Sequence, residues 1–459
     1  MVQFAGYRGP NVFLPLSLPA RMLREEFHRE MRFSIVPAVR SACSLAPWCA
    51  ALGLAFGGAL HAAQDLSSAR SLAAARQFPA AIAAYRQFLA THPRSEAAEL
   101  ELAACYRKVH NEDEARRLLQ QARREHPRSV AAAKALGNFE IEAQSYDAAI
   151  IALKAAVTLA PADLEARNFL GSAYQSKGDS ADALVQLDYV LGHDPRNGLA
   201  LYLRAQIHAD AGQDERALAD AENLVGVRPD YLPARALLAK ILIRLQQCPR
   251  AANVLRPAQS APQLDTQALF LLANAYDCAG QLGAAKSVRE EFAAASQSDR
   301  TRAENETQSK HLTEQAGDFA RQNQFPQALD FLQQALQKDP NNAFAYSQQA
   351  KISFSMHQPA QAREAIERAI GIQPYQPDFL YVSGILFAAE GKLDEALSAF
   401  NQVTQINPKE ADAFFEIGKI RLQQGNRTAA IAAFRQATTL DPNDAEYRRA
   451  LASARSKSL

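Results

Sequence analysis

The sequence predicts an all-α solenoid of about eleven helix–turn–helix units. Prolines recur with a constant period of about 34 residues, and two small residues precede each unit's end at constant distances. The composition agrees, because Ala, Leu, Gln, Arg and Glu are abundant helix formers and tryptophan occurs once. A fixed period over most of the 459 residues indicates stacked repeats rather than separate globular domains.

The prolines mark where each unit ends. They fall one period apart in two series: Pro93, Pro127, Pro161, Pro195 and Pro229, then Pro340, Pro374, Pro408 and Pro442. A proline has no backbone N–H to continue a helix. Each is therefore expected to close the second helix of its unit.

Small residues mark where the two helices of a unit cross. An alanine stands twelve residues before each unit's closing position, at Ala81, Ala115, Ala149, Ala183, Ala217, Ala251, Ala285, Ala328, Ala362, Ala396 and Ala430. Twelve residues earlier stands Gly or Ala, at Ala69, Ala103, Gly137, Gly171, Ala205, Ala239, Ala273, Ala316, Ala350, Gly384 and Gly418. In nine of eleven units a bulky apolar residue follows the alanine by four, as Phe434 follows Ala430. Small side chains let two helices approach closely, and the bulky one fills the space beside them.

Glycines occupy several of the turns between the paired helices. They are Gly178, Gly212, Gly280, Gly391 and Gly425. Glycine readily adopts the left-handed backbone conformation that stops a helix, so these positions are expected to end the first helix of their units.

The pattern resembles the tetratricopeptide-repeat family over roughly residues 62–444, for example in ARNFLGSAYQSKGDSADALVQLDYVLGHDP. The resemblance implies a right-handed superhelix with repeats 1–7 in 64–299 and repeats 8–11 in 309–444. Repeats six and seven depart locally, with Gln263 and Gln297 at the closing position and Arg289 in place of the bulky residue.

Two segments lie outside the regular period. Residues 300–308 (RTRAENETQ) are polar, and we expect them either to lengthen a helix or to act as a joint between two lobes. Residues 445–459 are expected to form a polar capping helix over the last apolar face.

The N-terminal region is typical of an exported protein. A segment free of Asp, Glu, Lys and Arg, residues 41–64, follows Arg32 and Arg40 and ends in small residues. This predicts a signal peptide within 31–63, with translation starting at Met31 and residues 1–30 a mis-annotated or disordered extension. The protein is then periplasmic or secreted. The alternative is an uncleaved N-terminal anchor in the inner membrane, facing the periplasm, and this is the only membrane association expected.

Charge and motifs argue against other classes of function. The net charge of +1 offers no reason to expect nucleic acid as a partner. The sequence has no HExxH, Walker-type or G-x-S-x-G motif, so we expect no enzyme activity, metal or cofactor. Beyond Cys43 and Cys49 there are three cysteines. Either all three are apolar packing residues, or Cys248 and Cys278 pair in an oxidising compartment.

In this family the first helix of each unit lines a groove that binds protein segments. The resemblance therefore implies a set of exposed groove residues: Lys134, Asn138, Asn168, Tyr202, Phe344, Lys351, Phe354, Tyr381, Phe415 and Lys419. Lys134 and Asn138 match the start of a clamp for a peptide's carboxylate, but Phe169, Leu199 and Leu203 replace its other residues.

These observations favour a protein-binding scaffold or adaptor, working in bacterial envelope assembly, export or secretion. The alternative is a non-catalytic regulatory or docking subunit of an envelope enzyme complex. Both rest on the resemblance, because a fold is compatible with many functions.

Overall fold

The computed structural model describes residues 66–259 and 265–456, and within these ranges the chain forms helices and turns without a strand. Contacts group the described residues into two units: unit 1 holds 128–259 and 265–292, and unit 2 holds 66–127 and 293–456. The division expected between repeats 7 and 8 stays a prediction. The expected signal segment and extension, residues 1–63, lie outside the described residues.

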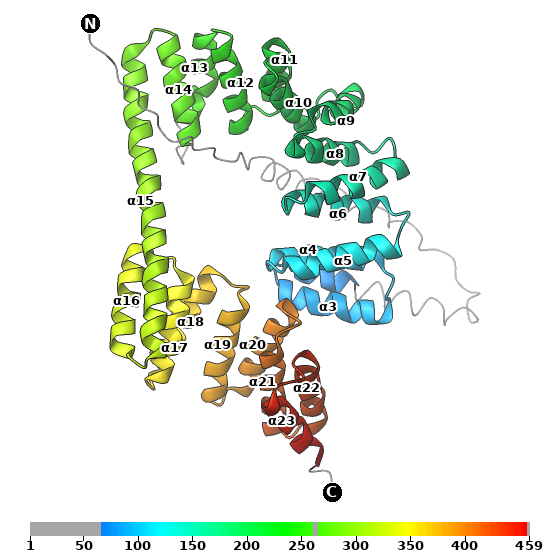
Figure 1. Ribbon diagram of the computed structural model, residues 1–459, viewed down its shortest axis with the longest axis vertical. Helices are drawn as coiled ribbons and strands as arrows, with labels where there is room; N and C mark the ends of the chain where they lie inside the picture. Colours follow the sequence, from blue (N-terminus) through cyan, green and yellow to red (C-terminus); the bar gives the residue numbers. More distant parts are fainter. Residues whose placement is uncertain (1–65, 260–264, 457–459) are drawn as a thin grey trace, which may run out of the picture. The chain divides into compact units, whose positions relative to one another are not determined.

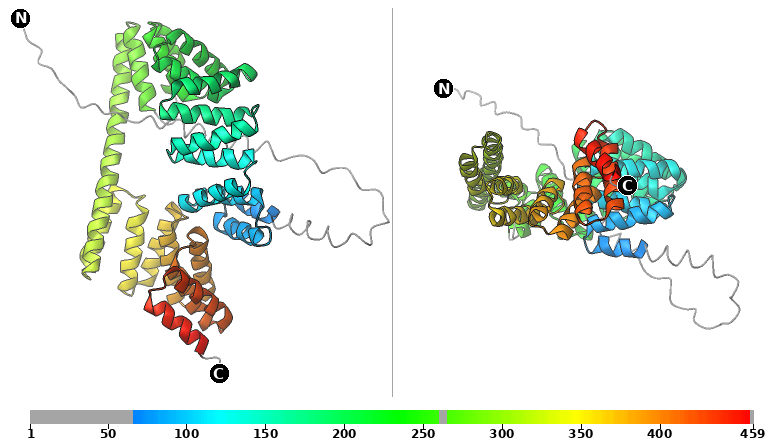
Figure 2. Two further views of the ribbon diagram at one scale, coloured as in Figure 1. Left: turned by 45° about the vertical axis from the view of Figure 1, so that its right-hand side comes forward. Right: turned by 90° about the horizontal axis from the view of Figure 1, so that it is seen from below.

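Unit 1 consists of repeats 3 to 7, each a pair of antiparallel helices (Figures 1 and 2). Its helices are α6 (Val130–Glu142), α7 (Tyr146–Leu159), α8 (Leu164–Lys177), α9 (Ser180–His193), α10 (Gly198–Asp210), α11 (Asp214–Val227), α12 (Leu232–Arg244), α13 (Cys248–Gln259), α14 (Thr266–Cys278) and the first part of α15 (Leu282–Arg321).

Unit 2 combines the first two repeats with the last four and the terminal helix. Residues 66–74 are helical and are followed by α3 (Phe78–Thr91), α4 (Glu96–Lys108) and α5 (Glu112–Glu125). After α15 come α16 (Phe325–Lys338), α17 (Ala343–Ser355), α18 (Pro359–Ile372), α19 (Pro377–Ala389), α20 (Leu393–Ile406), α21 (Ala411–Gln423), α22 (Arg427–Leu440) and α23 (Ala445–Ser456).

The helices end where the prolines predict. The second helix of a repeat stops two residues before its proline, as α5 does before Pro127 and α22 before Pro442. Short polar side chains then begin new helices. The Asp163 side chain accepts a hydrogen bond from the backbone N–H of Ala166 at 2.9 Å, which satisfies one of the free donors at the start of α8.

The turn between paired helices has one left-handed residue in every repeat. In five repeats it is the expected glycine, with φ between 70° at Gly212 and 96° at Gly178. In the other six it is a residue with a side chain, at Arg76, His110, Gln144, Gln246, Asn323 and His357. A left-handed conformation costs such a residue about 1 kcal/mol.

We expect Gln144→Gly to stabilise unit 1 by about 0.5–1 kcal/mol, because the glycine adopts φ 57° without the clash of a Cβ atom. The reciprocal change in the next repeat, Gly178→Gln, should destabilise by a similar amount. Urea unfolding of both variants measures the difference. If the two changes shifted the midpoint in the same direction, backbone strain would not explain this position.

The small residues allow the close helix crossings that the sequence predicts. Ala81, Ala115 and the equivalent alanines are 0% exposed. A Cβ atom added to Gly418 would lie 2.5 Å from the Phe434 ring, and one added to Gly384 would lie 2.8 Å from the Phe400 ring. In repeats 10 and 11 the phenyl ring therefore occupies the volume that a methyl group on the facing helix would need.

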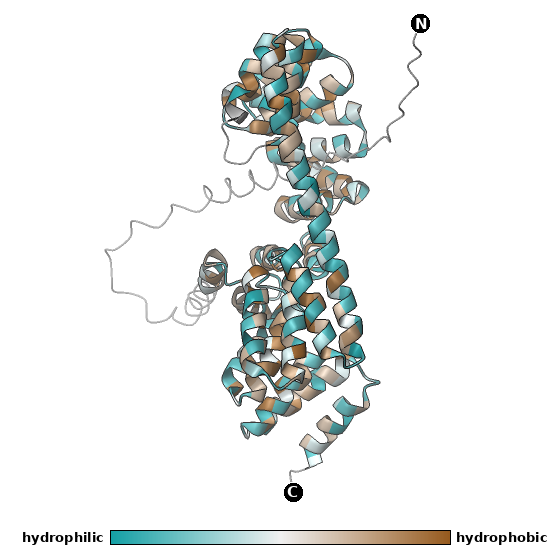
Figure 3. Ribbon diagram, turned by 90° about the vertical axis from the view of Figure 1, so that its left-hand side faces the viewer, coloured by the Kyte–Doolittle hydropathy of each residue, from teal (hydrophilic) through white to brown (hydrophobic). Residues whose placement is uncertain are grey.

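The nine-residue insertion 300–308 lies inside one helix, the 40-residue α15. Of the two expected outcomes, lengthening a helix is confirmed, while movement about this segment stays a prediction. Nearly all its side chains are exposed, and Figure 3 shows the middle of this long helix as hydrophilic. Because these side chains face solvent, this part of α15 does not pack against another helix through an apolar face.

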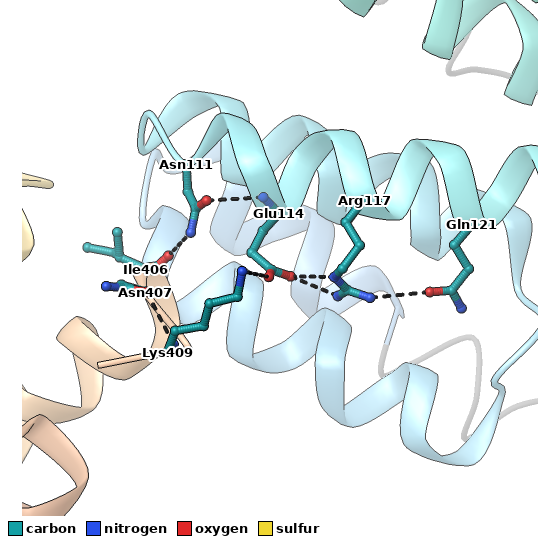
Figure 4. Close-up of polar contacts among 7 residues, drawn as sticks. All are labelled: Asn111, Glu114, Arg117, Gln121, Ile406, Asn407 and Lys409. Carbon is teal, nitrogen blue, oxygen red and sulfur yellow. Dashed lines mark hydrogen bonds and ion pairs between the residues drawn. The ribbon is translucent and has the colours of Figure 1, made fainter. Parts of the chain in front are cut away.

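Within unit 2, the first two repeats contact the turns that follow repeats 9 and 10. Asn111 Nδ2 donates to the Ile406 carbonyl at 2.6 Å, and Lys409 Nζ lies 3.9 Å from Glu114 Oε1 (Figure 4). Tyr375 donates its hydroxyl to the Arg76 carbonyl at 2.5 Å. The joined residues are about 300 positions apart in the sequence, so the period of the repeat could not predict this contact.

The last helix, α23, covers the apolar face of repeat 11. Tyr447 is buried and its ring lies 5.0 Å from that of Phe415, while Arg448, Arg449 and Arg455 are exposed. None of the described helices combines the length and the apolar character needed to cross a membrane.

Cys248 and Cys278 are joined by a disulfide, with their Cα atoms 5.6 Å apart. The bond ties the start of α13 to the end of α14, across the boundary between repeats 6 and 7. Of the two alternatives left open by the sequence, the structure adopts the pairing. Cys105 is the free cysteine of the described region, and its burial raises the pKa of the thiol to about 12.

Candidate functional site

A row of polar side chains with buried oxygen atoms runs along the first helices of repeats 3, 4 and 5. We call it the polar track, and it consists of Asn138 on α6, Asn168, Ser172 and Gln175 on α8, and Gln206 on α10. In each of these residues a buried side-chain oxygen has no hydrogen-bond partner. Since buried polar atoms are nearly always hydrogen-bonded, these five oxygens on neighbouring helices mark a stretch of unit 1 where acceptors have no donor from the protein itself.

The track has the period of the repeat. Asn138, Ser172 and Gln206 stand one period apart and so occupy the same position on three successive first helices. Helix α8 contacts both α6 and α10. Packed helices lie roughly 8–10 Å apart, so equivalent acceptors should recur at about that distance along the track.

Two of the four amides of the track, those of Asn168 and Gln206, are held in place by neighbouring side chains. Asn168 Nδ2 donates to Asn197 Oδ1 at 3.0 Å, and Gln206 Nε2 donates to the Tyr202 hydroxyl at 3.1 Å. Because the nitrogens of these two amides are engaged, their oxygens are left as acceptors. The track therefore offers acceptors to a ligand that donates hydrogen bonds.

Four groove residues expected in the first seven repeats lie on or beside this track, but three are not exposed. Asn138 is 4% exposed, Asn168 6% and Tyr202 3%. The expectation that they are exposed is wrong, because the first helices of adjacent repeats pack closely enough to cover side chains at their facing positions. Burial also raises the pKa of the Tyr202 phenol to about 12.

Lys134 is engaged by acidic residues of the next repeat. Its Nζ lies 2.9 Å from Asp163 Oδ2 and is also hydrogen-bonded to Glu165. Partial burial acts to lower the pKa of Lys134, but these two hydrogen bonds outweigh it and the pKa is raised. Two carboxylates already neutralise the ammonium group, which argues against a role in binding a peptide's carboxylate.

The expected groove residues of unit 2 divide into exposed and packed ones. Phe344 is 48% exposed, Lys351 is exposed, and the Lys419 side chain is half-exposed with Nζ 2.8 Å from Glu416. Phe354 and Tyr381 are half-buried.

Phe415 is 7% exposed, so its expected exposure is wrong. Its ring packs between those of Phe434 and Tyr447, at 5.6 and 5.0 Å. The terminal helix α23, which carries Tyr447, covers this position. Sequence reasoning missed this packing because it treated Phe415 like its equivalents in the other repeats.

A hollow in unit 2 lies over α16, α17 and α18, with a volume of about 370 Å³. Four amide side chains line it together with two leucines and a serine: Gln333, Gln337, Gln349 and Gln361 with Leu329, Leu336 and Ser353. Most of these residues come from second helices, which the sequence did not single out. The glutamine-rich run of α16 was the only signal that could have pointed to it.

Comparison with protein families identifies the repeat. One model described as "Tetratricopeptide repeat" matches residues 72–138, 319–381 and 387–454. A second model with the same description matches residues 170–229. Together these segments cover more than half of the chain.

Curated relatives share only short segments. The chain is 32% identical over 83 residues to the "Tetratricopeptide repeat and J domain-containing co-chaperone DNJ1" of Fusarium oxysporum, a match covering 18% of this chain and 16% of that protein. It is 29% identical over 110 residues to "Superkiller protein 3" of Schizosaccharomyces pombe, covering 24% of this chain and 8% of that protein. The chain thus spans about a sixth or less of the length of these relatives.

Solved structures resemble the chain at the level of the repeat. One is described as "a tetratricopeptide repeat protein from Parabacteroides merdae", with 16% identity, a TM-score of 0.31, and coverage of 71% of this chain and 98% of that one. Another is "YrrB: a TPR protein with an unusual peptide-binding site", with 17% identity, a TM-score of 0.27, and coverage of 57% and 96%. Similarities this low say nothing about the partner of this chain.

Proposed function

Because this chain belongs to the tetratricopeptide-repeat family, whose members act as protein-interaction scaffolds, we propose that it binds an extended protein segment along the polar track of unit 1. The observation that carries this proposal is the row of five buried side-chain oxygens without hydrogen-bond partners. An unsatisfied buried acceptor costs about 1–3 kcal/mol, so a ligand that displaces the side chains covering these oxygens and donates to them recovers that cost.

A polypeptide backbone has the donors that the track requires. An extended segment rises roughly 3.1–3.4 Å per residue, so every third backbone N–H recurs at about 9–10 Å. This matches the roughly 8–10 Å between equivalent positions on packed helices. Backbone recognition of this kind selects for an extended conformation more than for a sequence, and the side chains around the track add the specificity.

Selection of peptides on the full chain tests the proposal. A phage-displayed library of random fifteen-residue peptides is enriched on the protein, and the affinity of the selected peptides is measured by fluorescence polarisation. We expect extended peptides whose binding is lost in Gln206→Leu and kept in Gln333→Leu, which changes the separate hollow of unit 2. Peptides that bind both variants like the wild type would place the interaction elsewhere.

We further propose that the protein works in the bacterial envelope, after export through a signal peptide within 31–63. The charge-free segment 41–64 supports this, as does the disulfide between Cys248 and Cys278, since such bonds persist in oxidising compartments. There the protein serves as a scaffold in assembly, export or secretion.

N-terminal sequencing of the native protein and fractionation of the cells test the proposed location. We expect the mature chain to begin at Ala63 or Gln64 in the periplasmic fraction. A chain that retains Met31 in the membrane fraction would indicate an anchor instead. An intact N-terminus in the cytosol would overturn the proposal of export, without affecting the peptide-binding proposal.

A further inference from the structure

Repeat 2 gathers three potential metal ligands at one end of its helix pair. Glu99 lies in the first turn of α4, Glu125 is the last residue of α5, and His126 follows it. One carboxylate oxygen or imidazole nitrogen of each residue lies within 4.8 Å of those of the other two. We call these three residues the repeat-2 cluster.

The carboxylate at the centre of this cluster is buried, with His126 beside it as an ion-pair partner. Glu99 is 2% exposed, and neither of its carboxylate oxygens has a hydrogen-bond partner. The neighbouring His126 Nε2 is also buried and without one, although it lies 3.3 Å from Glu99 Oε2. A buried carboxylate costs several kcal/mol unless hydrogen bonds or a cation compensate it.

The electrostatics of the cluster favour an added positive charge. Glu99 and Glu125 bring carboxylate oxygens within 4.8 Å of each other, and the Glu99 side chain is buried. The carboxylates of Glu99 and Glu125 therefore lie close together, and the Glu99 carboxylate is shielded from solvent. A divalent cation between them would remove the repulsion between the two carboxylates and replace the lost solvation.

The set of donor atoms indicates which class of cation fits. One imidazole nitrogen and two carboxylate oxygens suit zinc and similar divalent transition metals, whereas magnesium and calcium prefer oxygen ligands alone. Ligand atoms at about 2.0–2.1 Å from a tetrahedral zinc ion stand roughly 3.3 Å apart. The separation of His126 Nε2 and Glu99 Oε2, at 3.3 Å, is already this distance.

We propose that Glu99, Glu125 and His126 bind a divalent transition-metal ion, with zinc as the best fit. Gln121 Nε2 donates a hydrogen bond to Glu125 Oε1 at 2.8 Å, which helps to orient the Glu125 carboxylate. The bound ion joins the beginning of α4 to the end of α5, which fastens the two helices of repeat 2 at their open end.

None of the other repeats has all three residues: repeat 1 has Asp65 and His92 at the positions of Glu99 and His126, but Thr91 at the position of Glu125. Repeat 3 has Ala133 and Ala160 in place of Glu99 and His126, and repeat 4 has Arg167 and Asp194. The complete set of three ligands is therefore not a consequence of the repeat pattern, because it occurs in repeat 2 alone.

Isothermal titration of the full chain, without a histidine tag, with zinc chloride tests the proposal. We expect one site per chain that a large excess of magnesium does not displace. Glu99→Gln and His126→Asn should each weaken it about tenfold or more, because each removes one of three ligands. Zinc should also raise the melting temperature of the wild type but not of either variant.

His92→Asn provides the matched control. His92 occupies the position of His126 one period earlier, where its ring stacks on Phe88 at 4.5 Å, so its loss should leave the zinc site unchanged. Far-UV circular dichroism checks that each variant folds. A wild type that binds no zinc, or a His126→Asn variant that binds it as tightly as the wild type, would overturn the proposal and leave an ion pair between His126 and Glu99.

Discussion

Asn138→Leu should make the unliganded protein more stable, by about 1 kcal/mol, and weaken its binding to selected peptides at least tenfold. The side chain is 4% exposed and its oxygen has no hydrogen-bond partner. Leucine has nearly the same shape and no polar atom to leave unsatisfied, so folding no longer carries that cost. Binding loses the acceptor to which the ligand donates.

The opposite signs of the two effects make this prediction specific. Urea unfolding measures stability, and fluorescence polarisation with a peptide selected on the wild type measures binding. Asn274→Leu is the matched control, because Asn274 holds the same position in repeat 7, is only half-buried and lies outside the polar track. A variant at position 138 that lost stability and kept its affinity would show that Asn138 serves the fold and not a ligand.

Gly418→Ala should destabilise unit 2 by about 1–3 kcal/mol, although alanine is the better helix former. The added Cβ atom would lie 2.5 Å from the Phe434 ring, and a packed core relieves such an overlap only by displacing side chains or helices. The gain in helix propensity, about 1 kcal/mol, is smaller than this cost. Thermal and urea unfolding of the variant measure the net effect.

A double-mutant cycle separates crowding from other causes. Repeat 2 combines Ala103 with Leu119 at the positions of Gly418 and Phe434, so the chain itself contains the compatible pair. In the background of Phe434→Leu, Gly418→Ala should therefore be neutral or stabilising. If the alanine cost as much in that background as in the wild type, its contact with the ring would not be the cause.

The repeat architecture could be predicted because each unit carries its own local signals. Pro127 and Pro442 end helices by lacking an N–H, and Gly178 adopts a left-handed turn, whatever surrounds them. The crossings at Ala81 and Gly418 follow from side-chain size, which is also visible in the sequence. These properties act within about one unit and recur from each repeat to the next.

The candidate site could be predicted only in part. The position of Asn138 on the first helix follows from the period, but its burial depends on how closely the neighbouring first helices pack. Gln175 and Gln206 were missed because a glutamine on a helix is ordinarily exposed, and nothing in their spacing shows an unsatisfied oxygen. Phe415 was expected to be exposed even though a capping helix was predicted, because the sequence does not show that Tyr447 of this helix packs against the Phe415 ring.

The amino-acid sequence by itself determined the all-α repeat fold, the ends of its helices and the small residues at their crossings, since these depend on the local properties of single residues. Only the tertiary structure decided which side chains are covered, which polar atoms lack partners, and which distant residues meet, as Asn111 meets Ile406 and Glu99 meets His126. Burial and hydrogen bonding are properties of pairs of surfaces. A periodic sequence predicts which residues each helix surface carries, but it does not predict which other surface packs against it.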